Sequence, residues 1–522
     1  MSRLRNYARS VLSSYAQLGA NVLYSLVSIP LALSFLPRRE FGLWALLMPI
    51  VGYISLVDFG MTSAVSRLLI DHKDQQQNKT YGALIKTAFL VGLVQAVIIF
   101  CLIALLAPAI AEVLRVPPEY ASVFVRLLRI QGAVSAFGFA VRPFGLVLTA
   151  HQRMDLCSYG EIFSLFSSLG LLWLLLSKGL GVFSFVYATA ISTVLVPIYL
   201  ALECNKLKLF PDSGEWGKIT GKLFREVFAY GKDVFLVAVG TQMILASQTL
   251  IVSRRLGLDA AAAWAVGTKM FNLIGQLVSR LIAVSMPALS EMIARAERER
   301  LAARFKGLVA IIASLSAFLG ISLALCNSVF VSVWTAGKIS WLPLNDLLLG
   351  VWLFVFSLQG IHNNLAIATK RIEMLRYVYF FEGCTFLGLA ILVGSRFGIT
   401  GIIITSIVCT TAFSLSYGIW RSSRYFARGL SVVAINWTAP GLTVAATFGA
   451  IAAVAWNTTI WLPLTLRLVT NGSIAIILGG FLFLRLGIPT GMRQEFGTRA
   501  PRLLKYFLQS PKQPVVVSTP PL

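Results

Sequence analysis

The chain has 522 residues, of which 57% are hydrophobic and only 13% charged, and its mean hydropathy is +0.79. Soluble globular proteins carry about a quarter charged residues, so this composition excludes a soluble cytosolic enzyme. The formal net charge of +24 would suggest a nucleic-acid partner in a soluble protein, but excess Lys and Arg in cytoplasmic loops produces the same balance in a membrane protein. No nucleic-acid partner is expected.

The hydrophobic residues form runs of about twenty, which is the length needed to cross ~30 Å of hydrocarbon as a helix. We predict an all-α polytopic membrane protein with about 14 transmembrane helices, although 12 or 13 remain open because the run 124–149 carries several Arg residues and Lys178-Gly179 alone separates the next two runs. The predicted spans are 11–35, 41–65, 82–108, 124–149, 157–177, 180–202, 228–253, 259–286, 308–333, 343–369, 376–395, 398–420, 432–456 and 462–484.

The distribution of positive charge predicts the orientation. When loops are assigned to alternate sides, 31 of the 45 Lys and Arg residues fall on the side of the amino terminus and 8 on the opposite side. This excess predicts an even number of spans with both termini in the cytoplasm. The first span is long and contains Ser, Gln, Asn and Tyr, so we expect it to be retained and not cleaved as a signal peptide.

Two turns share a pattern about 216–220 positions apart. Arg38-Arg39 precedes Gly42 and Trp44-Ala45, and Arg254-Arg255 precedes Gly257 and Trp264-Ala265. Either the chain is a duplication whose halves are related by an axis along the membrane normal, or Arg and Trp anchors arose twice at a membrane interface. The predicted domains are an N-terminal six-helix lobe (1–205), a cytoplasmic linker (206–227), a C-terminal six-helix lobe (228–430), two additional helices (431–487) and a basic disordered cytoplasmic tail (488–522).

Polar side chains form stripes along single faces of several spans. At 100° per residue, Lys269, Asn272, Gln276 and Arg280 share one face, and Lys269 and Arg280 project only ~20° apart. A Lys or Arg near the middle of the membrane costs ~2.5–3.5 kcal/mol on an insertion scale, so these residues must face protein or water. The other stripes consist of Gln17, Asn21, Tyr24 and Ser28 in the first span, and of Gln359 and Asn363 beside His362 in the tenth.

Two interpretations of the stripes compete. Hydrogen bonds between helices, each worth under ~2 kcal/mol, remain open for the neutral residues. Few acidic residues, mainly Asp58, Glu161 and Glu382, lie within spans, so the charged residues favour a water-filled cationic cavity. Such a cavity suits an anionic ligand such as phosphate, and the neutral groups are able to bind sugar hydroxyls. The predicted substrate-binding residues are Lys269, Arg280, Arg129, Arg142, Asn272, Gln276, Gln17 and Asn21.

Arg129 and Arg142 project ~220° apart on an ideal helix, so both face a cavity only if Pro143 or local unwinding turns the chain.

Several motifs are absent. The chain has no G-x-x-x-x-G-K-[ST] phosphate loop, which excludes ATP-driven transport within it. His72, His151 and His362 lack metal-ligand spacing, and for His362 packing between helices is favoured over proton coupling. Glu112 and Glu119 are the only acidic pair near the outer loops, which gives glycosyl transfer little support. We predict no metal, no cofactor and no enzymatic activity.

Two segments carry a family resemblance. Phe41-Gly42-Leu43-Trp44, followed by Leu56-Val57-Asp58-Phe59-Gly60-Met61 and Arg67, resembles the polysaccharide transporter branch of the multidrug/oligosaccharidyl-lipid/polysaccharide exporter (MOP) superfamily, which contains the O-antigen and exopolysaccharide flippases. Arg142-Pro143-Phe144, together with 150–155 and Glu161, resembles the segment that joins helices 4 and 5 in that branch. The resemblance extends over about residues 1–430 in layout and is specific over 41–67 and 142–161.

The resemblance implies two six-helix lobes and two extra helices that work by alternating access in a bacterial inner membrane. The implied substrate is a polyprenyl-pyrophosphate-linked oligosaccharide for lipopolysaccharide or exopolysaccharide synthesis, carried between leaflets of the lipid bilayer. Proton or sodium counter-transport, or the membrane potential, would supply energy. Asp58, at the matching Leu-x-Asp-x-Gly position, would serve as a conformational latch or an ion-coupling group.

Two alternatives remain open. A cation or drug exchanger on the same scaffold should place carboxylates in its cavity, and their scarcity within the spans argues against it. A membrane glycosyltransferase, polymerase or ligase would transfer sugar to an acceptor in detergent, without a second compartment.

Overall fold

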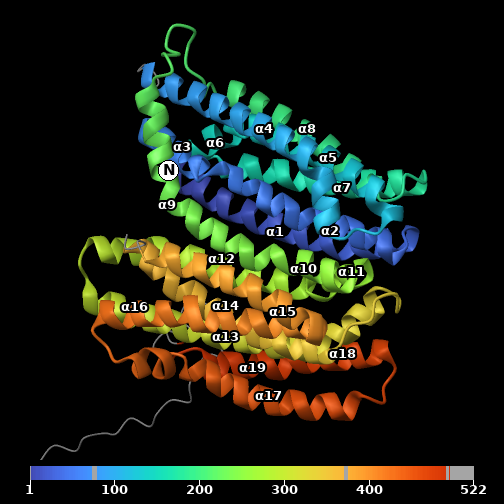
Figure 1. Cartoon of the computed structure of the whole chain (residues 1–522). Helices are drawn as coiled ribbons and strands as arrows, with labels where there is room; N and C mark the ends of the chain where they lie inside the picture. The colour runs from blue at the N-terminus through green and yellow to red at the C-terminus, as the bar shows by residue number, and fades with distance from the viewer. Residues whose placement is uncertain (1, 73–78, 370–373, 490–492, 494–522) are drawn as a thin grey trace, which may run out of the picture. The chain divides into compact units, whose positions relative to one another are not determined.

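The computed structural model describes residues 2–72, 79–369, 374–489 and 493, and this part of the chain is almost wholly helical, with no β-strand in it (Figure 1). Within the described residues, 13 helices are long and apolar enough to cross a membrane. The prediction of an all-α polytopic membrane protein is therefore confirmed. Residues 490–492 and 494–522, which make up most of the predicted basic tail, lie outside the described part.

The count of 13 depends on one helical stretch that contains two predicted spans. Leu375–Phe426 is 52 residues long, which at 1.5 Å per residue corresponds to ~78 Å, far beyond a bilayer. The first helix of this stretch, α15 (Leu375–Thr410), is interrupted at Gly398, whose φ of 60° and ψ of −143° suit glycine. A Cβ atom on Gly394 would lie 3.2 Å from Cγ1 of Ile402, so the chain folds back on itself there. Both predicted spans, 376–395 and 398–420, are thus present as separate helical segments.

The described chain divides into two compact units. The first comprises Met1–Lys269, Val331–Trp341 and Ile372–Cys409. Besides α15 up to Cys409 and the last residues of the helix that ends at Trp334, its helices are α1 (Ser2–Phe35), α2 (Arg38–Ile54), the short 3-10 helix η1 (Ser55–Asp58), α3 (Met61–His72), α4 (Lys79–Val113), α5 (Pro118–Val141), α6 (Pro143–Ala150), α7 (Met154–Ser177), α8 (Phe183–Lys206), α9 (Gly221–Leu245), α10 (Ser247–Leu256) and α11 (Leu258–Gly267).

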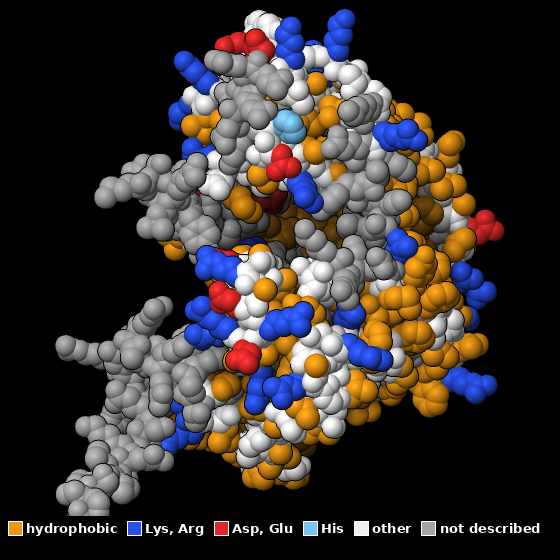
Figure 2. Space-filling view, turned by 90° about the vertical axis from the view of Figure 1, so that its left-hand side faces the viewer, with side chains coloured by type: hydrophobic (Ala, Val, Ile, Leu, Met, Phe, Trp, Pro, Cys, Tyr) orange, Lys and Arg blue, Asp and Glu red, His pale blue; other side chains and the backbone are white. Residues whose placement is uncertain are grey.

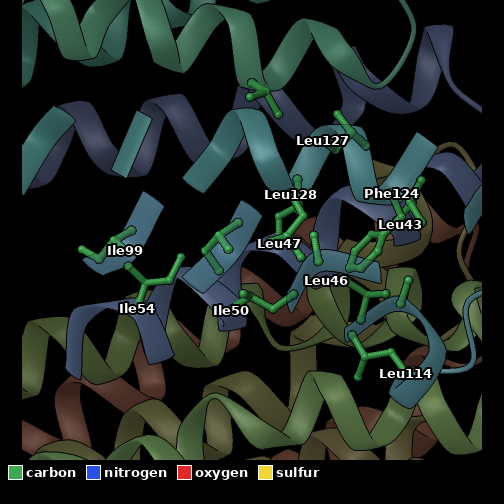
Figure 3. Close-up of a cluster of buried hydrophobic side chains, with 14 of the residues drawn as sticks. Leu43, Leu46, Leu47, Ile50, Ile54, Ile99, Leu114, Phe124, Leu127 and Leu128 are labelled. Atoms are coloured by element: carbon green, nitrogen blue, oxygen red, sulfur yellow. The ribbon is translucent and has the colours of Figure 1, made fainter. Parts of the chain in front are cut away.

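The core of the first unit is built from apolar side chains, mostly aliphatic, that recur every three or four residues, so that they fall on one helix face. Figure 3 shows them pointing toward one another between α2, α4 and α5. Lipid is as apolar as these side chains, so close packing, and not removal from water, stabilises the cluster. The labelled members are Leu43, Leu46, Leu47, Ile50, Ile54, Ile99, Leu114, Phe124, Leu127 and Leu128.

Helix ends in the first unit gather at two opposite ends. Arg39 at the start of α2 forms ion pairs with Glu119 at the start of α5 (3.3 Å) and with Asp259 at the start of α11 (3.4 Å). At the other end, the Tyr81 hydroxyl near the start of α4 donates to the Leu209 carbonyl after α8 (3.2 Å). These groupings agree with the alternation of loops that the charges predict, while the cytoplasmic assignment of one end stays a prediction.

The second unit comprises Met270–Phe330, Leu342–Arg371 and Thr410–Leu522. One face of α12 packs on α13 and α14 through a buried cluster that includes Val278, Ile282, Phe305 and Leu358. The helices are α12 (Lys269–Ala294), α13 (Arg298–Trp334), α14 (Pro343–Ala368), α16 (Ser416–Phe426), α17 (Ala439–Thr459), α18 (Leu464–Ile474) and α19 (Gly480–Leu482), with π-helical segments η2 (Thr411–Leu415), η3 (Val432–Asn436), η4 (Ala475–Gly479) and η5 (Phe483–Gly487).

Several predicted spans are broken into shorter helices, among them the second, the fourth and the eighth. The second span turns at Phe59 and Gly60, which have φ values of 47° and 73°, between η1 and α3. The fourth divides into α5 and α6 at Pro143, because proline lacks an N–H for the preceding turn. The eighth divides into α11 and α12 at Thr268, whose hydroxyl donates to the Trp264 carbonyl (2.7 Å).

The two compact units group residues by packing, whereas the predicted lobes follow the order of the chain. The division into lobes at 1–205 and 228–430 therefore stays a prediction.

Figure 2 views the end of the molecule that lies at the left of Figure 1, and Lys and Arg side chains are spread over its described surface.

Candidate functional site

The predicted positive stripe lies on α12 and starts at its first residue. Lys269 follows the break at Thr268 and is half-buried, while Asn272, Gln276 and Arg280 are exposed on the following turns. Phe271, Leu273 and Val278, which lie between them in the sequence, are buried in the core. The stripe therefore occupies the face of α12 that the protein leaves open, opposite its packed face.

An open face near the middle of a membrane-spanning helix has two possible neighbours, lipid or water. Arg280 lies close to the midpoint of α12, and no ion pair is recorded for it or for Lys269 among the described residues. Contact with lipid would cost ~2.5–3.5 kcal/mol for each charge, so an aqueous environment is the favoured one. The predicted role of these residues in substrate binding is compatible with this geometry and stays a prediction.

The stripe predicted in the first span lies on α1. Gln17 and Asn21 are both half-buried, whereas Ser28 is buried on the side that packs within the unit. Amides in this position are able to hydrogen-bond another helix or a ligand, and both interpretations from the sequence stay open.

Asp58 and Arg142 form an ion pair, although they are 84 positions apart. Nη1 of Arg142 lies 2.9 Å from Oδ1 of Asp58, and the two side chains are 33% and 19% exposed. The same Nη1 donates to the Thr62 hydroxyl at 2.7 Å, and that hydroxyl donates to Asp58. The pair fastens the turn between η1 and α3 to the junction of α5 and α6.

Neighbouring groups complete this network. The Gln95 side-chain amide on α4 donates to the Asp58 carbonyl at 3.2 Å. The Arg142 guanidinium lies over the Phe139 ring, with 3.9 Å between Cζ and the ring centroid. Asp58 therefore neutralises Arg142, which makes a latch between these elements the role of Asp58 that the geometry favours. Sequence reasoning missed Thr62 and Gln95, because a hydroxyl or an amide in a span carries no distinctive signal.

Arg129 lies apart from this network. Its side chain on α5 is exposed, and no ion pair with another described residue is recorded for it. Arg142, by contrast, is turned toward Asp58 at the Pro143 junction. The structure therefore gives the two arginines different surroundings, and a substrate-binding role for each stays a prediction.

His362 on α14 is fully enclosed. Its Nδ1 lies 2.8 Å from the Ser422 hydroxyl of α16, and its ring meets the Phe305 ring edge-on, with centroids 5.7 Å apart. This arrangement matches the packing role favoured from the sequence. Within the described residues, no group of three or more His, Cys, Asp or Glu side chains is arranged to hold a metal ion.

The two copies of the repeated turn contact each other inside the first unit. A Cβ atom on Gly42 of α2 would lie 2.1 Å from the Leu258 carbonyl oxygen at the start of α11, so only glycine permits this approach. The Arg39–Asp259 ion pair lies beside it. The contact joins the helix that follows the first Arg pair to the helix that follows the second.

Comparison with known sequences identifies the family. Residues 31–343, more than half of the chain, match the sequence model of a family described as "Polysaccharide biosynthesis protein". The chain belongs to this family. No curated protein matches the chain.

Solved structures similar to this polysaccharide biosynthesis family member are transporters of the MOP superfamily. A multidrug resistance MATE family transporter in its inward-facing conformation has a TM-score of 0.66 and 14% identity, over 77% of this chain and 94% of that one. An outward-facing MATE transporter gives a TM-score of 0.59 and 14% identity, over 81% and 96%. A MOP transporter from Pyrococcus furiosus gives 0.55 and 14%, over 82% and 96%. These likenesses establish the fold, and with the family match they confirm the resemblance to the polysaccharide transporter branch.

Proposed function

We propose that the protein is a flippase that moves a polyprenyl-pyrophosphate-linked oligosaccharide across the membrane by alternating access, in the synthesis of a surface polysaccharide. The family match supports polysaccharide biosynthesis, and the fold supports transport. In this proposal the pyrophosphate and the sugars pass through an aqueous lumen, while the polyprenyl chain stays in lipid.

One observation carries the proposal, namely the positive open face of α12. Lys269 and Arg280 lie on one helix with about 20° between their directions, at the ends of a stripe three turns long. Arg and Lys suit the oxygens of a pyrophosphate, and Asn272 and Gln276 between them offer donors and acceptors to sugar hydroxyls. A drug exchanger for cations would need carboxylates there, and this stripe has none.

Alternating access also requires a contact that opens and closes. The Gly42–Leu258 contact between α2 and α11 is a candidate, because the two helices belong to different predicted lobes. The flanking ion pairs of Arg39 are exposed to solvent, so they are weak enough to break in each cycle.

The proposal is tested in proteoliposomes that contain a fluorescent polyprenyl-pyrophosphate oligosaccharide. We expect Lys269→Glu and Arg280→Glu to abolish translocation while insertion stays normal, because each places a carboxylate where the pyrophosphate binds. Arg298→Glu is the matched control, since Arg298 is equally charged but lies at the exposed start of α13. Translocation by both α12 variants at the wild-type rate would refute the assignment of Lys269 and Arg280 to a substrate-binding cavity.

The same assay separates the alternatives. Sugar transfer to an acceptor in detergent, with no second compartment, would identify a glycosyltransferase or polymerase. Dependence of translocation on a proton or sodium gradient would identify the energy source.

A further inference from the structure

The second unit contains a cavity that the α12 stripe does not share. It has a volume of about 680 Å³ and lies where α13, η3, α17 and the end of η5 converge. This volume falls within the range of small-molecule binding sites, ~300–1,000 Å³. Helices α13 and α17 touch closely at one point, because a Cβ atom on Gly441 would lie 2.6 Å from Ala313.

The cavity has a charged part and an apolar part. Arg304 and Lys306 line it from α13, and Asn436 lies at its edge on η3. Ala310, Pro440 and Leu486 supply apolar lining from three different helices. A ligand that fits must therefore combine a negative group with a hydrocarbon group.

Helix lengths give the depth of the cavity in the bilayer. From Lys306 to Trp334 at the end of α13 there are 28 residues, or ~42 Å at 1.5 Å per residue. A bilayer with its headgroup layers is ~40–45 Å thick, so Lys306 reaches the headgroup layer opposite Trp334. Helix α17 has 21 residues, or ~30 Å, which matches the hydrocarbon core and places Pro440 near its boundary.

We propose that this cavity binds one anionic phospholipid from the leaflet at the start of α13. The phosphate and the negative headgroup contact Arg304 and Lys306, and an acyl chain lies against Ala310 and Pro440. The headgroup layer and the boundary of the hydrocarbon meet at this depth, so the charged and the apolar parts of the cavity match the two parts of a phospholipid. None of the α12 stripe residues lines this site, so it does not depend on the transport proposal.

Two other occupants are less suitable. The segment that follows Pro489 in the sequence contains Arg499, Arg502 and Lys505, so its charge is repelled by a basic cavity. A polyprenyl pyrophosphate has the right sign of charge, and it is therefore included in the test as a competitor.

The test measures retention of phosphatidylglycerol and phosphatidylcholine by the full-length protein with native mass spectrometry. We expect the wild-type protein to retain one phosphatidylglycerol molecule in preference to phosphatidylcholine. Arg304→Gln with Lys306→Gln should weaken the apparent affinity for that molecule by about tenfold or more, because two surface charges are lost. Arg304→Lys with Lys306→Arg should retain it, which separates loss of charge from a failure to fold.

The matched control is Arg298→Gln with Arg428→Gln, which removes two exposed positive charges that do not line the cavity. Equal loss of phosphatidylglycerol in this control, or no preference over phosphatidylcholine in the wild type, would overturn the proposal. Displacement of phosphatidylglycerol by equimolar undecaprenyl pyrophosphate would also overturn it and would assign the cavity to the substrate.

Discussion

At the residue scale, the Asp58–Arg142 pair is a partly buried ion pair that joins distant parts of the first unit. Both partners are partly shielded from solvent, and Thr62 bonds to each of them. An arginine left without its carboxylate here would have a charge in a poorly hydrated place, which is costly. The pair thus stabilises the junction of α5 and α6 as well as the turn after η1.

We expect Asp58→Asn or Arg142→Gln to lower the free energy of unfolding by about 1.5–3 kcal/mol, the range for hydrogen bonds to charged groups. The double variant should cost less than the sum of the single ones, because the partner that is left unpaired is removed as well. Thermal unfolding in detergent measures the stability of the two single variants and of the double variant. Strict additivity would show that the pair contributes no coupling energy.

The sequence singled out both residues but assigned them separate roles. Asp58 was predicted as a latch or coupling group from its family motif, and Arg142 as a substrate ligand from its charge. Their separation of 84 positions gives no periodicity to connect them, so only the folded chain reveals the pair. By contrast, the stripe on α12 follows from helical spacing alone, because all four residues lie on one helix.

At the scale of elements, α12 presents two open faces of different chemistry. Gln276 and Arg280 lie on one, while Leu277 and Val284 lie on the other, about 80–100° from Gln276 and about 40–60° from Arg280, and are 46% and 59% exposed. The polar face suits water, and the apolar face suits lipid.

Single cysteines at these positions, in a chain without its natural cysteines, test this assignment. We expect a charged maleimide to label Gln276→Cys and Ser279→Cys but not Leu277→Cys or Val284→Cys, because the reagent does not enter hydrocarbon. Val278→Cys serves as a buried control, since Val278 is only 1% exposed. Equal labelling at 276 and 284 would contradict the division into an aqueous and a lipid face.

Helices α13 and α14 approach each other through a pair of glycines. A Cβ atom on Gly320 would lie 2.7 Å from the Gly350 carbonyl oxygen, and one on Gly350 would lie 2.5 Å from that of Gly320. Small residues allow such approach between membrane helices.

We expect Gly320→Leu to destabilise the protein by about 1–3 kcal/mol or more, as overpacking of a tight contact does. Gly472→Leu is the matched control, because no atom lies within 4 Å of a Cβ built there. Thermal unfolding of the two variants gives the comparison, and equal melting temperatures would show that α13 and α14 can separate at little cost.

The existence of the elements was predictable, but their interruptions were less so. Apolar runs predicted α7 and α8 as separate spans although Lys178-Gly179 barely divides them. The turn at Phe59 was missed because a non-glycine residue with positive φ has no sequence signal, and the break at Thr268 was missed because threonine is common in spans.

At the scale of the whole molecule, the Gly42–Leu258 contact joins parts of the chain that are more than 200 positions apart. We expect Gly42→Leu to reduce translocation at least tenfold with normal insertion, because a larger side chain prevents α2 from closing on α11. Gly19→Leu on α1 is the control, since a Cβ there meets no atom within 4 Å. Equal translocation rates for the two variants, measured in the same proteoliposomes, would show that transport does not require this contact.

Composition and charge established that this is a polytopic membrane protein and predicted the alternation of its loops. They could not determine which helices pack together in each compact unit. A contact such as that between Gly42 and Leu258 brings two backbones together and needs no repeating pattern of apolar residues, so the sequence carries no signal for it.

The ion pairs of Arg39 have a further consequence. Each partner is more than half exposed, so dissolved ions compete directly with Glu119 and Asp259 for the guanidinium. The dwell time of the closed arrangement should therefore shorten as ionic strength rises at that surface. In proteoliposomes, added salt at that surface should therefore favour the proposed separation of α2 from α11.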